Sequence, residues 1–173
     1  MDNLIKKIVY FILLATILSS CSTVKVTSDY DSKANFTEYK TFAFYKKGIN
    51  SLKLSDIDKK RILSAVEREL IRKGFTTSES PDVLVNLATN SEEYIEYSRR
   101  LESFSGWPSK TRKYTKGVIS VELIDHDDKK LVWQGTASGV LNYINTKEAT
   151  LNKEKQIKEF VTEIMAKYPP AAE

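Results

Sequence analysis

Cysteine and histidine are almost absent from this chain of 173 residues, which contains one of each, Cys21 and His126. A single cysteine excludes an intramolecular disulfide and a cysteine-based metal site. A Ser-His-Asp or Cys-His nucleophilic site would have to use His126, and the chain has no Gly-x-Ser-x-Gly motif. We therefore predict no catalytic residues, no metal site and no cofactor.

Charge of one sign is not concentrated anywhere. The chain has 27 Lys and Arg against 23 Asp and Glu, a net charge of +4, and basic residues alternate with acidic ones, as in residues 58–61 and 153–155. A nucleic-acid interface needs clustered positive charge, so we expect no nucleic-acid partner. Apolar residues make up 41% of the chain, which is enough to bury the core of one compact domain.

The longest apolar run lies at the N-terminus. Lys6 and Lys7 precede apolar residues 8–18, a run that is short for a membrane span but typical of a signal peptide. The following Leu18-Ser19-Ser20-Cys21 resembles the lipobox of bacterial lipoproteins, in which the cysteine thiol receives diacylglycerol and becomes the new N-terminus. We predict a signal peptide at residues 1–20 and a single domain at residues 21–173.

An acylated Cys21 predicts the location of the domain. Two or three acyl chains, such as palmitate, would hold the domain at a membrane, whereas one chain alone binds only marginally. Ser22 follows the cysteine where an aspartate would be an inner-membrane signal, and resemblance to enterobacterial sorting therefore favours the outer membrane, with the domain facing the periplasm. The alternative is an uncleaved N-terminal membrane anchor in which Cys21 is an ordinary thiol.

One helix is well marked by the sequence. Ser55 is a good N-cap, the next turn is acidic, and apolar residues recur at the helical spacing Ile62, Val66 and Leu70. Gly74 is placed to end the helix in a left-handed conformation. A second helix is predicted to begin at residue 146 or 147 and to be stopped by residues 168–170, with its buried face formed by Ile157, Val161, Ile164 and Met165.

The remaining segments predict strands. Alternating or continuous apolar runs occur at residues 24–30, 41–45 and 83–88, and two further runs at 114–124 and 131–140 form a hairpin joined by polar residues 125–130. Residues 48–54 are predicted to be a loop, and residues 92–111 fit a strand edge or an ordered loop. Strands and helices do not alternate strictly, so we predict an α+β, two-layer fold with a mainly antiparallel sheet and two helices on one face.

Several segments together resemble an uncharacterised bacterial lipoprotein family known as domain of unknown function 4136. The similarity lies in Tyr39-Lys40-Thr41-Phe42-Ala43-Phe44, Lys73-Gly74-Phe75, Pro81-Asp82-Val83-Leu84-Val85, Leu131-Val132-Trp133-Gln134-Gly135-Thr136-Ala137 and Tyr168-Pro169-Pro170. It covers most of the chain after Cys21. The resemblance implies an envelope lipoprotein of α+β fold, and it supplies no reaction and no catalytic residues.

Candidate binding residues gather in the segment that departs from that family pattern. Tyr94, Tyr97, Phe104 and Trp107 are interleaved with charges and are our candidates for a binding surface. Glutamates 92, 93 and 96, near Tyr94 and Tyr97, would supply paired carboxylates for glycosidase-like chemistry, or the segment would cradle a sugar against its aromatic rings. The same pattern also describes a half-buried surface strand or helix.

Two other groups favour structural roles. Residues 125–128, Asp-His-Asp-Asp, contain ligands for a divalent cation, but consecutive turn residues point in different directions and a solvated turn explains them. Trp133, Phe42, Phe44, Tyr30, Tyr39 and Tyr45 are interpreted as core and sheet surface.

We therefore expect a non-enzymatic, lipid-anchored cell-envelope protein that binds or supports another envelope component, either a protein or a glycan. The alternative is a small-molecule or lipid carrier, and less favoured is a hydrolase that uses carboxylates of residues 92–96. A carrier needs an apolar cavity and a hydrolase needs two facing carboxylates in a cleft.

Overall fold

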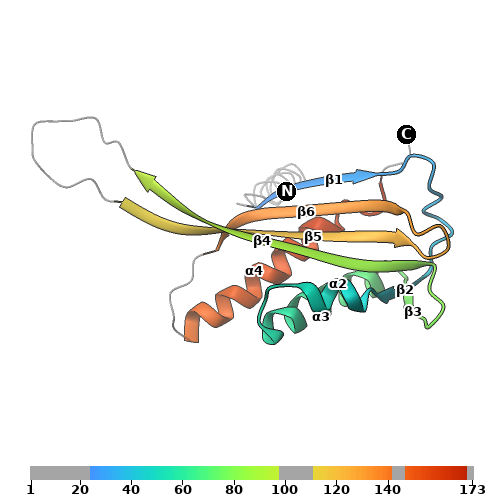
Figure 1. Ribbon diagram of the computed structural model, residues 1–173, viewed down its shortest axis with the longest axis horizontal. Helices are drawn as coiled ribbons and strands as arrows, with labels where there is room; N and C mark the ends of the chain where they lie inside the picture. The colour runs from blue at the N-terminus through green and yellow to red at the C-terminus, as the bar shows by residue number, and fades with distance from the viewer. Residues whose placement is uncertain (1–23, 98–110, 142–146, 171–173) are drawn as a thin grey trace, which may run out of the picture.

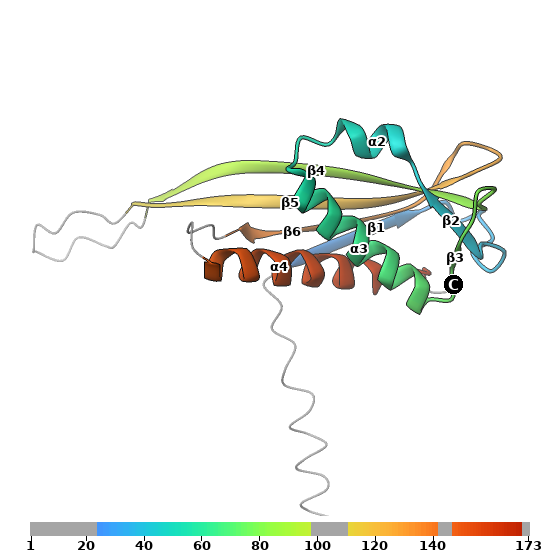
Figure 2. The same cartoon turned by 90° about the horizontal axis from the view of Figure 1, so that it is seen from below.

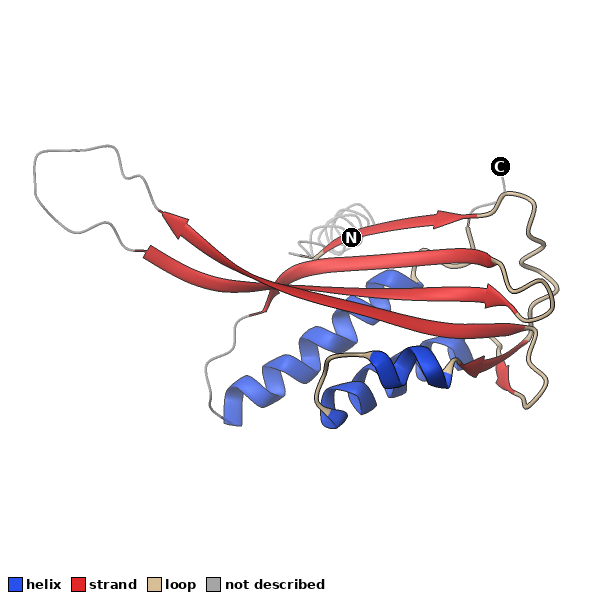
Figure 3. Cartoon of the chain, in the orientation of Figure 1, coloured by secondary structure: helices blue, strands red, loops and turns tan. Residues whose placement is uncertain are grey.

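The computed structural model describes residues 24–97, 111–141 and 147–170. Six strands form one sheet in the order β1-β6-β5-β4-β2-β3 (Figures 1 and 3). The strands are β1 (Lys25–Tyr30), β2 (Thr41–Phe44), β3 (Thr76–Thr77), β4 (Val83–Tyr97), β5 (Thr111–Asp125) and β6 (Leu131–Leu141), and the helices are α2 (Lys46–Ser51), α3 (Asp56–Arg72) and α4 (Lys147–Met165).

The sheet is mainly antiparallel. Strands β4, β5 and β6 form an antiparallel meander, β1 pairs with the outer side of β6, and β2 lies parallel to both β4 and β3. The predicted α+β fold class is confirmed, and so is the hairpin between β5 and β6. Polar residues 125–130 turn the chain there, as expected.

Helices α3 and α4 lie side by side across one face of the sheet (Figure 2). The Ser55 side chain accepts a hydrogen bond from the Asp58 backbone N–H at 3.2 Å, and Gly74 has a φ of 90°, so both predicted ends of α3 are confirmed. Among the described helices, none combines the length and the apolar character that crossing a bilayer requires.

The core fills the space between these two helices and the sheet. Val83, Val85 and Leu87 alternate along β4 with residues that face away, so every second side chain is buried. Fully buried partners come from every layer: Phe42, Val66, Leu70, Val121, Leu123, Trp133, Val161, Ile164 and Met165. The interpretation of Phe42 and Trp133 as core residues is confirmed.

Two segments differ from the prediction or were left open by it. Residues 48–54, predicted as a loop, are helical as far as Ser51, because α2 packs beside the edge of β4 (Figure 2). Strand β4 continues to Tyr97 because its ladder with β5 persists, as far as the pair between Tyr97 and Thr111. Both outcomes depend on contacts with strands distant in sequence, which the sequence of each segment alone does not reveal.

Candidate functional site

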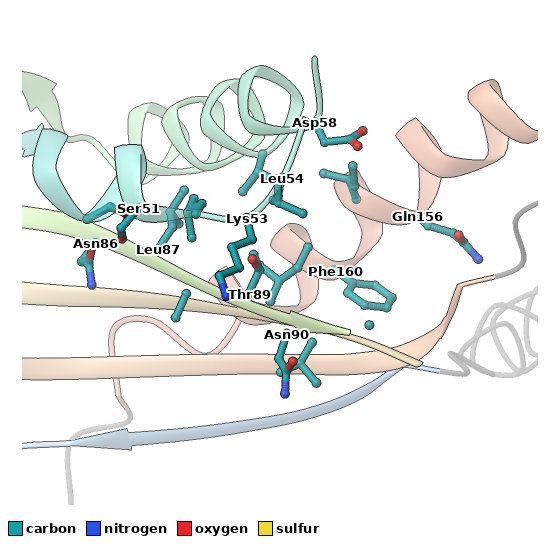
Figure 4. A pocket seen from close by; sticks show the side chains of 18 of the residues that line it. Ser51, Lys53, Leu54, Asp58, Asn86, Leu87, Thr89, Asn90, Gln156 and Phe160 are labelled. Carbon is teal, nitrogen blue, oxygen red and sulfur yellow. The ribbon is translucent and has the colours of Figure 1, made fainter. Parts of the chain in front are cut away.

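A cavity of about 750 Å³ opens between the helices and the middle of strands β4 and β5 (Figure 4). The loop between α2 and α3, the first turns of α3, the middle of α4 and strands β4 and β5 all contribute to its lining. Small-molecule sites are typically concave and have volumes of about 300–1,000 Å³. The cavity is therefore large enough for a small ligand.

The interior of the cavity is mainly apolar. Phe160 of α4 projects toward the strands in Figure 4, and its ring lies close to Gly139 of β6, where an added Cβ would be 2.8 Å from the ring's Cζ atom. Glycine at 139 thus makes room for this ring at the cavity wall. Other apolar lining residues are Leu52, Leu54, Ile62, Leu87, Ile119 and Ile157.

A charged cluster stands where α3 and α4 meet at the cavity. Asp58 is 6% exposed, and its carboxylate accepts hydrogen bonds from Ser55 Oγ at 2.8 Å and from Arg61 Nη1 at 3.0 Å. Lys153 of α4 donates to the same carboxylate through its Nζ and forms an ion pair with it. The cluster joins the first turn of α3 to α4 and neutralises the buried carboxylate.

The protonation state of Asp58 follows from these contacts. Burial alone would raise the pKa of this carboxyl, because a charge is costly in a poorly solvated site. Hydrogen bonds from Lys153, Ser55 and Arg61 outweigh the effect of burial, and the pKa lies below its usual value of 3.8. Asp58 is thus a carboxylate at neutral pH, a state suited to holding the two cations rather than to donating a proton.

The polar part of the rim comes from α2, from the loop after it and from β4. Lys53 lies in that loop, is exposed, and its side chain extends toward Thr89 (Figure 4). Asn86 donates from Nδ2 to Glu122 Oε2 at 2.8 Å, and its buried Oδ1 has no hydrogen-bond partner among the described atoms. Among the described residues, Lys53 has no carboxylate within ion-pair distance, so its ammonium group remains available at the rim.

A second depression, of about 670 Å³, lies at the end of the sheet where β1 ends. Phe36 meets Tyr30, Tyr39 and Tyr168 edge to face there, with ring centroids 5.8–6.1 Å apart. Tyr39 donates its hydroxyl to Asp125 Oδ2 at 2.9 Å, and burial together with this bond raises the pKa of Tyr39 to about 12. These aromatic rings form much of the wall of the depression and pack on one another.

The turn at residues 125–128 is built by its own hydrogen bonds. Asp125 Oδ1 accepts the backbone N–H groups of Asp127 and Asp128, each at 2.9 Å. Because its other oxygen accepts from Tyr39, both carboxylate oxygens are engaged in the turn. Within the described ranges, no three Asp, Glu, His or Cys side chains gather as metal ligands would.

The predicted binding residues lie largely outside the described residues. Cys21, Phe104 and Trp107 belong to segments that the structure does not describe. Tyr94 and Tyr97 occupy positions in β4, where they pair in register with Tyr114 and Thr111, and their side chains are not described. The binding surface proposed for them stays a prediction.

None of the residues that line the cavity was predicted from the sequence to belong to a binding site. Asp58 is one of the acidic residues predicted in the first turn of a helix, and this local role gives no sign of its contact with Lys153. Lys153 and Lys53 are two of many lysines on a chain of mixed charge. No local signal marks them, because the fold alone brings residues 53, 58 and 153 together.

Comparison with known proteins agrees with the fold. The family described as Domain of unknown function (DUF4136) matches residues 26–170. No curated protein matches the chain. Among solved structures, a PDZ domain protein from Parabacteroides distasonis ATCC 8503 aligns with a TM-score of 0.54 and 17% identity, over 92% of this chain and 39% of that one.

Two further structures are less similar. The PelC dodecamer from Paraburkholderia phytofirmans has a TM-score of 0.49 and 11% identity, over 83% of this chain and 95% of that one. A putative neuraminyllactose-binding hemagglutinin homolog from Helicobacter pylori has a TM-score of 0.45 and 13% identity, over 82% and 90% of the two chains. At 17% identity, the likeness to the PDZ domain protein concerns the fold alone.

Proposed function

Because the chain belongs to the family described as Domain of unknown function (DUF4136), which carries no assigned activity, we propose a function from the site itself: a non-enzymatic module that binds a small amphipathic molecule. The observation that carries the proposal is the cavity of about 750 Å³, which has an apolar interior and cationic groups at its rim. An amphipathic ligand would place its apolar part against Phe160 and its neighbours, and a polar or anionic end near Lys53.

The cavity favours a carrier over the other functions considered. A glycosidase-like hydrolase needs two carboxylates facing each other across a cleft. Among the described residues that line the cavity, Asp58 is the single carboxylate, and it is engaged by Lys153 and Arg61. A module that binds only protein or glycan partners would need no apolar hollow of this size.

The proposal includes an envelope location. The lipobox-like sequence ending at Cys21 supports acylation of this residue and attachment to a bacterial membrane, with the outer membrane and its periplasmic face favoured by Ser22. Growth on labelled palmitate should label the protein. Substitution Cys21→Ser should abolish the label and release the protein into the soluble fraction, and a labelled Cys21→Ser variant would contradict acylation at this site.

Ligand binding is tested best on a chain that begins at Ser22. Every described core residue lies between residues 42 and 168 and the first strand begins at Lys25, so this form retains all described contacts. Calorimetric titration with dodecanoate should show saturable binding, and a saturating ligand should raise the unfolding temperature, since a hundredfold excess over Kd stabilises by about 2.7 kcal/mol.

A cavity-filling variant supplies the specificity test. Thr89 lines the cavity, so Thr89→Trp should abolish dodecanoate binding. Thr27 is an exposed strand residue of β1 outside the lining, and Thr27→Trp is the matched control that should bind normally. Equal binding by both variants would show that dodecanoate binds elsewhere and would remove the cavity from the proposal.

A further inference from the structure

The start of the described chain and the cavity lie on one transverse row of the sheet, which crosses β4 and β5 at the middle of their length. The strand register places Lys25 opposite Ser138, Ser138 opposite Val118, and Val118 opposite Asn90. Val118 and Asn90 line the cavity. A single transverse row of the sheet therefore runs from the beginning of β1 to the cavity wall.

This geometry limits how far the cavity can be from an anchored Cys21. Two residues, Ser22 and Thr23, separate Cys21 from Val24, and three steps of an extended chain at about 3.5 Å each span at most about 10 Å. Neighbouring strands are about 4.8 Å apart, so the three steps from β1 to β4 add about 14 Å. The cavity wall would thus lie within about 24 Å of an anchored Cys21. The aromatic depression and Pro170 lie farther away, at the end of the sheet where β1 ends.

The charges around the cavity favour an anionic group at its rim. Arg61 and Lys153 are both paired with Asp58, and Glu122 is bonded to the lining residue Asn86, so these charges largely compensate one another. Asp58 is already bonded to Arg61 and Lys153, and Lys53 is the exposed cation of the set. A charge-assisted hydrogen bond from its ammonium group would suit a phosphate or carboxylate oxygen.

The apolar interior suits a hydrocarbon chain. Each methylene that moves from water into an apolar site favours binding, so a ligand gains affinity with the length of chain that it buries there. Ile62, Leu87 and Ile157 bring apolar side chains from a helix, a strand and the second helix to the same space.

We propose that the cavity receives an acyl chain of an anionic membrane lipid, and that Lys53 contacts the lipid head group. This inference rests on the proposed function and specifies its ligand: a lipid taken from the membrane beside the tether rather than a water-soluble amphiphile. Lys53 is a head-group recognition residue, and the apolar wall around Phe160 holds the chain. The location of the cavity next to the tether is the feature that a soluble ligand would not require.

The test uses the chain that begins at Ser22 and two kinds of vesicle. Protein is incubated with vesicles of phosphatidylethanolamine and phosphatidylglycerol, or of phosphatidylcholine alone, and is then separated from them by gel filtration. Lipid extracted from the protein fraction should be phosphatidylglycerol. Lys53→Glu should weaken its binding by about tenfold or more, the effect of losing one charge-assisted contact worth about 1.4 kcal/mol.

Lys60→Glu is the matched control, because Lys60 is exposed on α3, is not part of the cavity lining and undergoes the same change of charge. It should leave binding within about twofold of the original, since exposed charges at a distance are screened by salt. Equal losses in both variants, or equal uptake of phosphatidylcholine, would overturn recognition of an anionic head group at Lys53.

The inference and the proposed function fail in different ways. Uptake of phosphatidylglycerol that Thr89→Trp abolishes supports both. Calorimetric binding of dodecanoate without any lipid in the protein fraction would overturn the membrane-lipid ligand and leave the amphiphile-binding function standing. Absence of both dodecanoate and lipid binding, in a chain that unfolds cooperatively on heating, would overturn both.

Discussion

Substitution of Gly135 by alanine should destabilise the protein by overpacking the interface between α4 and the sheet. A Cβ atom at this position would lie 2.5 Å from Trp133 Cη2 and 2.6 Å from Ile164 Cγ2. Both neighbours are fully buried, so neither can move into solvent to relieve the contact. The effect matters for the site, because α4 supplies one wall of the cavity.

The magnitude follows from two opposing effects. Overpacking of a well-packed core costs about 1–3 kcal/mol, and two close contacts with enclosed side chains put this case near the upper end. Replacement of glycine within a strand returns about 0.5 kcal/mol of backbone entropy. A net loss of about 2 kcal/mol should lower the unfolding temperature by about 4–8 °C, measured by circular dichroism or calorimetry.

Two controls separate steric conflict from other causes. Gly74→Ala meets no atom within 4 Å but has a φ of 90°, so it should lose only about 1 kcal/mol through backbone strain. Ile164→Ala should cost less in the Gly135→Ala background than alone, because it removes the clashing methyl group. An unchanged or higher unfolding temperature for Gly135→Ala would show that Trp133 and Ile164 do not pack on this glycine.

Three further predictions concern the polar contacts. Asp58→Asn should lower the free energy of unfolding, measured in urea at pH 7, by about 1–3 kcal/mol. Because the folded pKa of Asp58 lies below 3.8, its stabilising contribution is present above about pH 4 and is lost as the pH falls further. An equal loss of stability at pH 3 and pH 7 would contradict a stabilising role for the Asp58 carboxylate. Tyr39 stabilises the fold below pH 10 and loses this contribution as the pH rises toward 12. Ultraviolet titration of Tyr39→Phe should therefore show one fewer tyrosine that ionises late, near pH 12. Loss of a tyrosine that ionises near pH 10 would instead refute the hydrogen bond to Asp125. Gly48→Ala, which would normally favour a helix, should instead destabilise by about 1 kcal/mol, since its Cβ would be 1.9 Å from Asn86 Oδ1; a raised unfolding temperature would count against this packing.

The elements with strong local signals were predictable. The capping residue Ser55, the spacing of Ile62 and Leu70, and Gly74 are sufficient to define α3, because all of these interactions form within a few residues. The hairpin around residues 125–130 has the same character, with Asp125 closing its own turn through side-chain bonds to the backbone. In such segments the sequence period and the turn chemistry agree with the final structure.

Elements defined by long-range contacts were less accessible. Helix α2 contains Gly48, which lowers helix propensity, and forms where the chain runs beside β4. Strand β3 has two residues, Thr76 and Thr77, and exists only through parallel pairing with β2. The continuation of β4 to Tyr97 likewise needs the partner strand β5. No window of sequence contains both sides of these contacts.

The cavity is the clearest case of a feature that periodicity cannot predict. An apolar stripe on a helix shows which side chains face the sheet, but it does not show where helix and sheet separate. Position 139 illustrates the difficulty, because only the fold shows that its missing Cβ makes room for the ring of Phe160. Likewise, nothing in the sequence distinguishes Lys53 and Lys153 from other lysines, and only the fold shows that both lie at the cavity.

The two polar links between α3 and α4 explain how such a cavity is compatible with a stable helix pair. Asp58, in the first turn of α3, bonds to Lys153 in the first half of α4, and Glu69 accepts from Thr162 Oγ1 at 3.1 Å near the ends of both helices. These links are eleven residues apart along α3, about 16 Å at 1.5 Å per residue, so both helices run in the same direction and are held at two points. Apolar packing joins them to the sheet at the Glu69 end, whereas the charged cluster holds them together at the end where the cavity interrupts that packing. Weakening the Asp58 link should therefore change ligand binding as well as stability, and a stability loss with unchanged binding would show that the helix spacing at the cavity is set elsewhere.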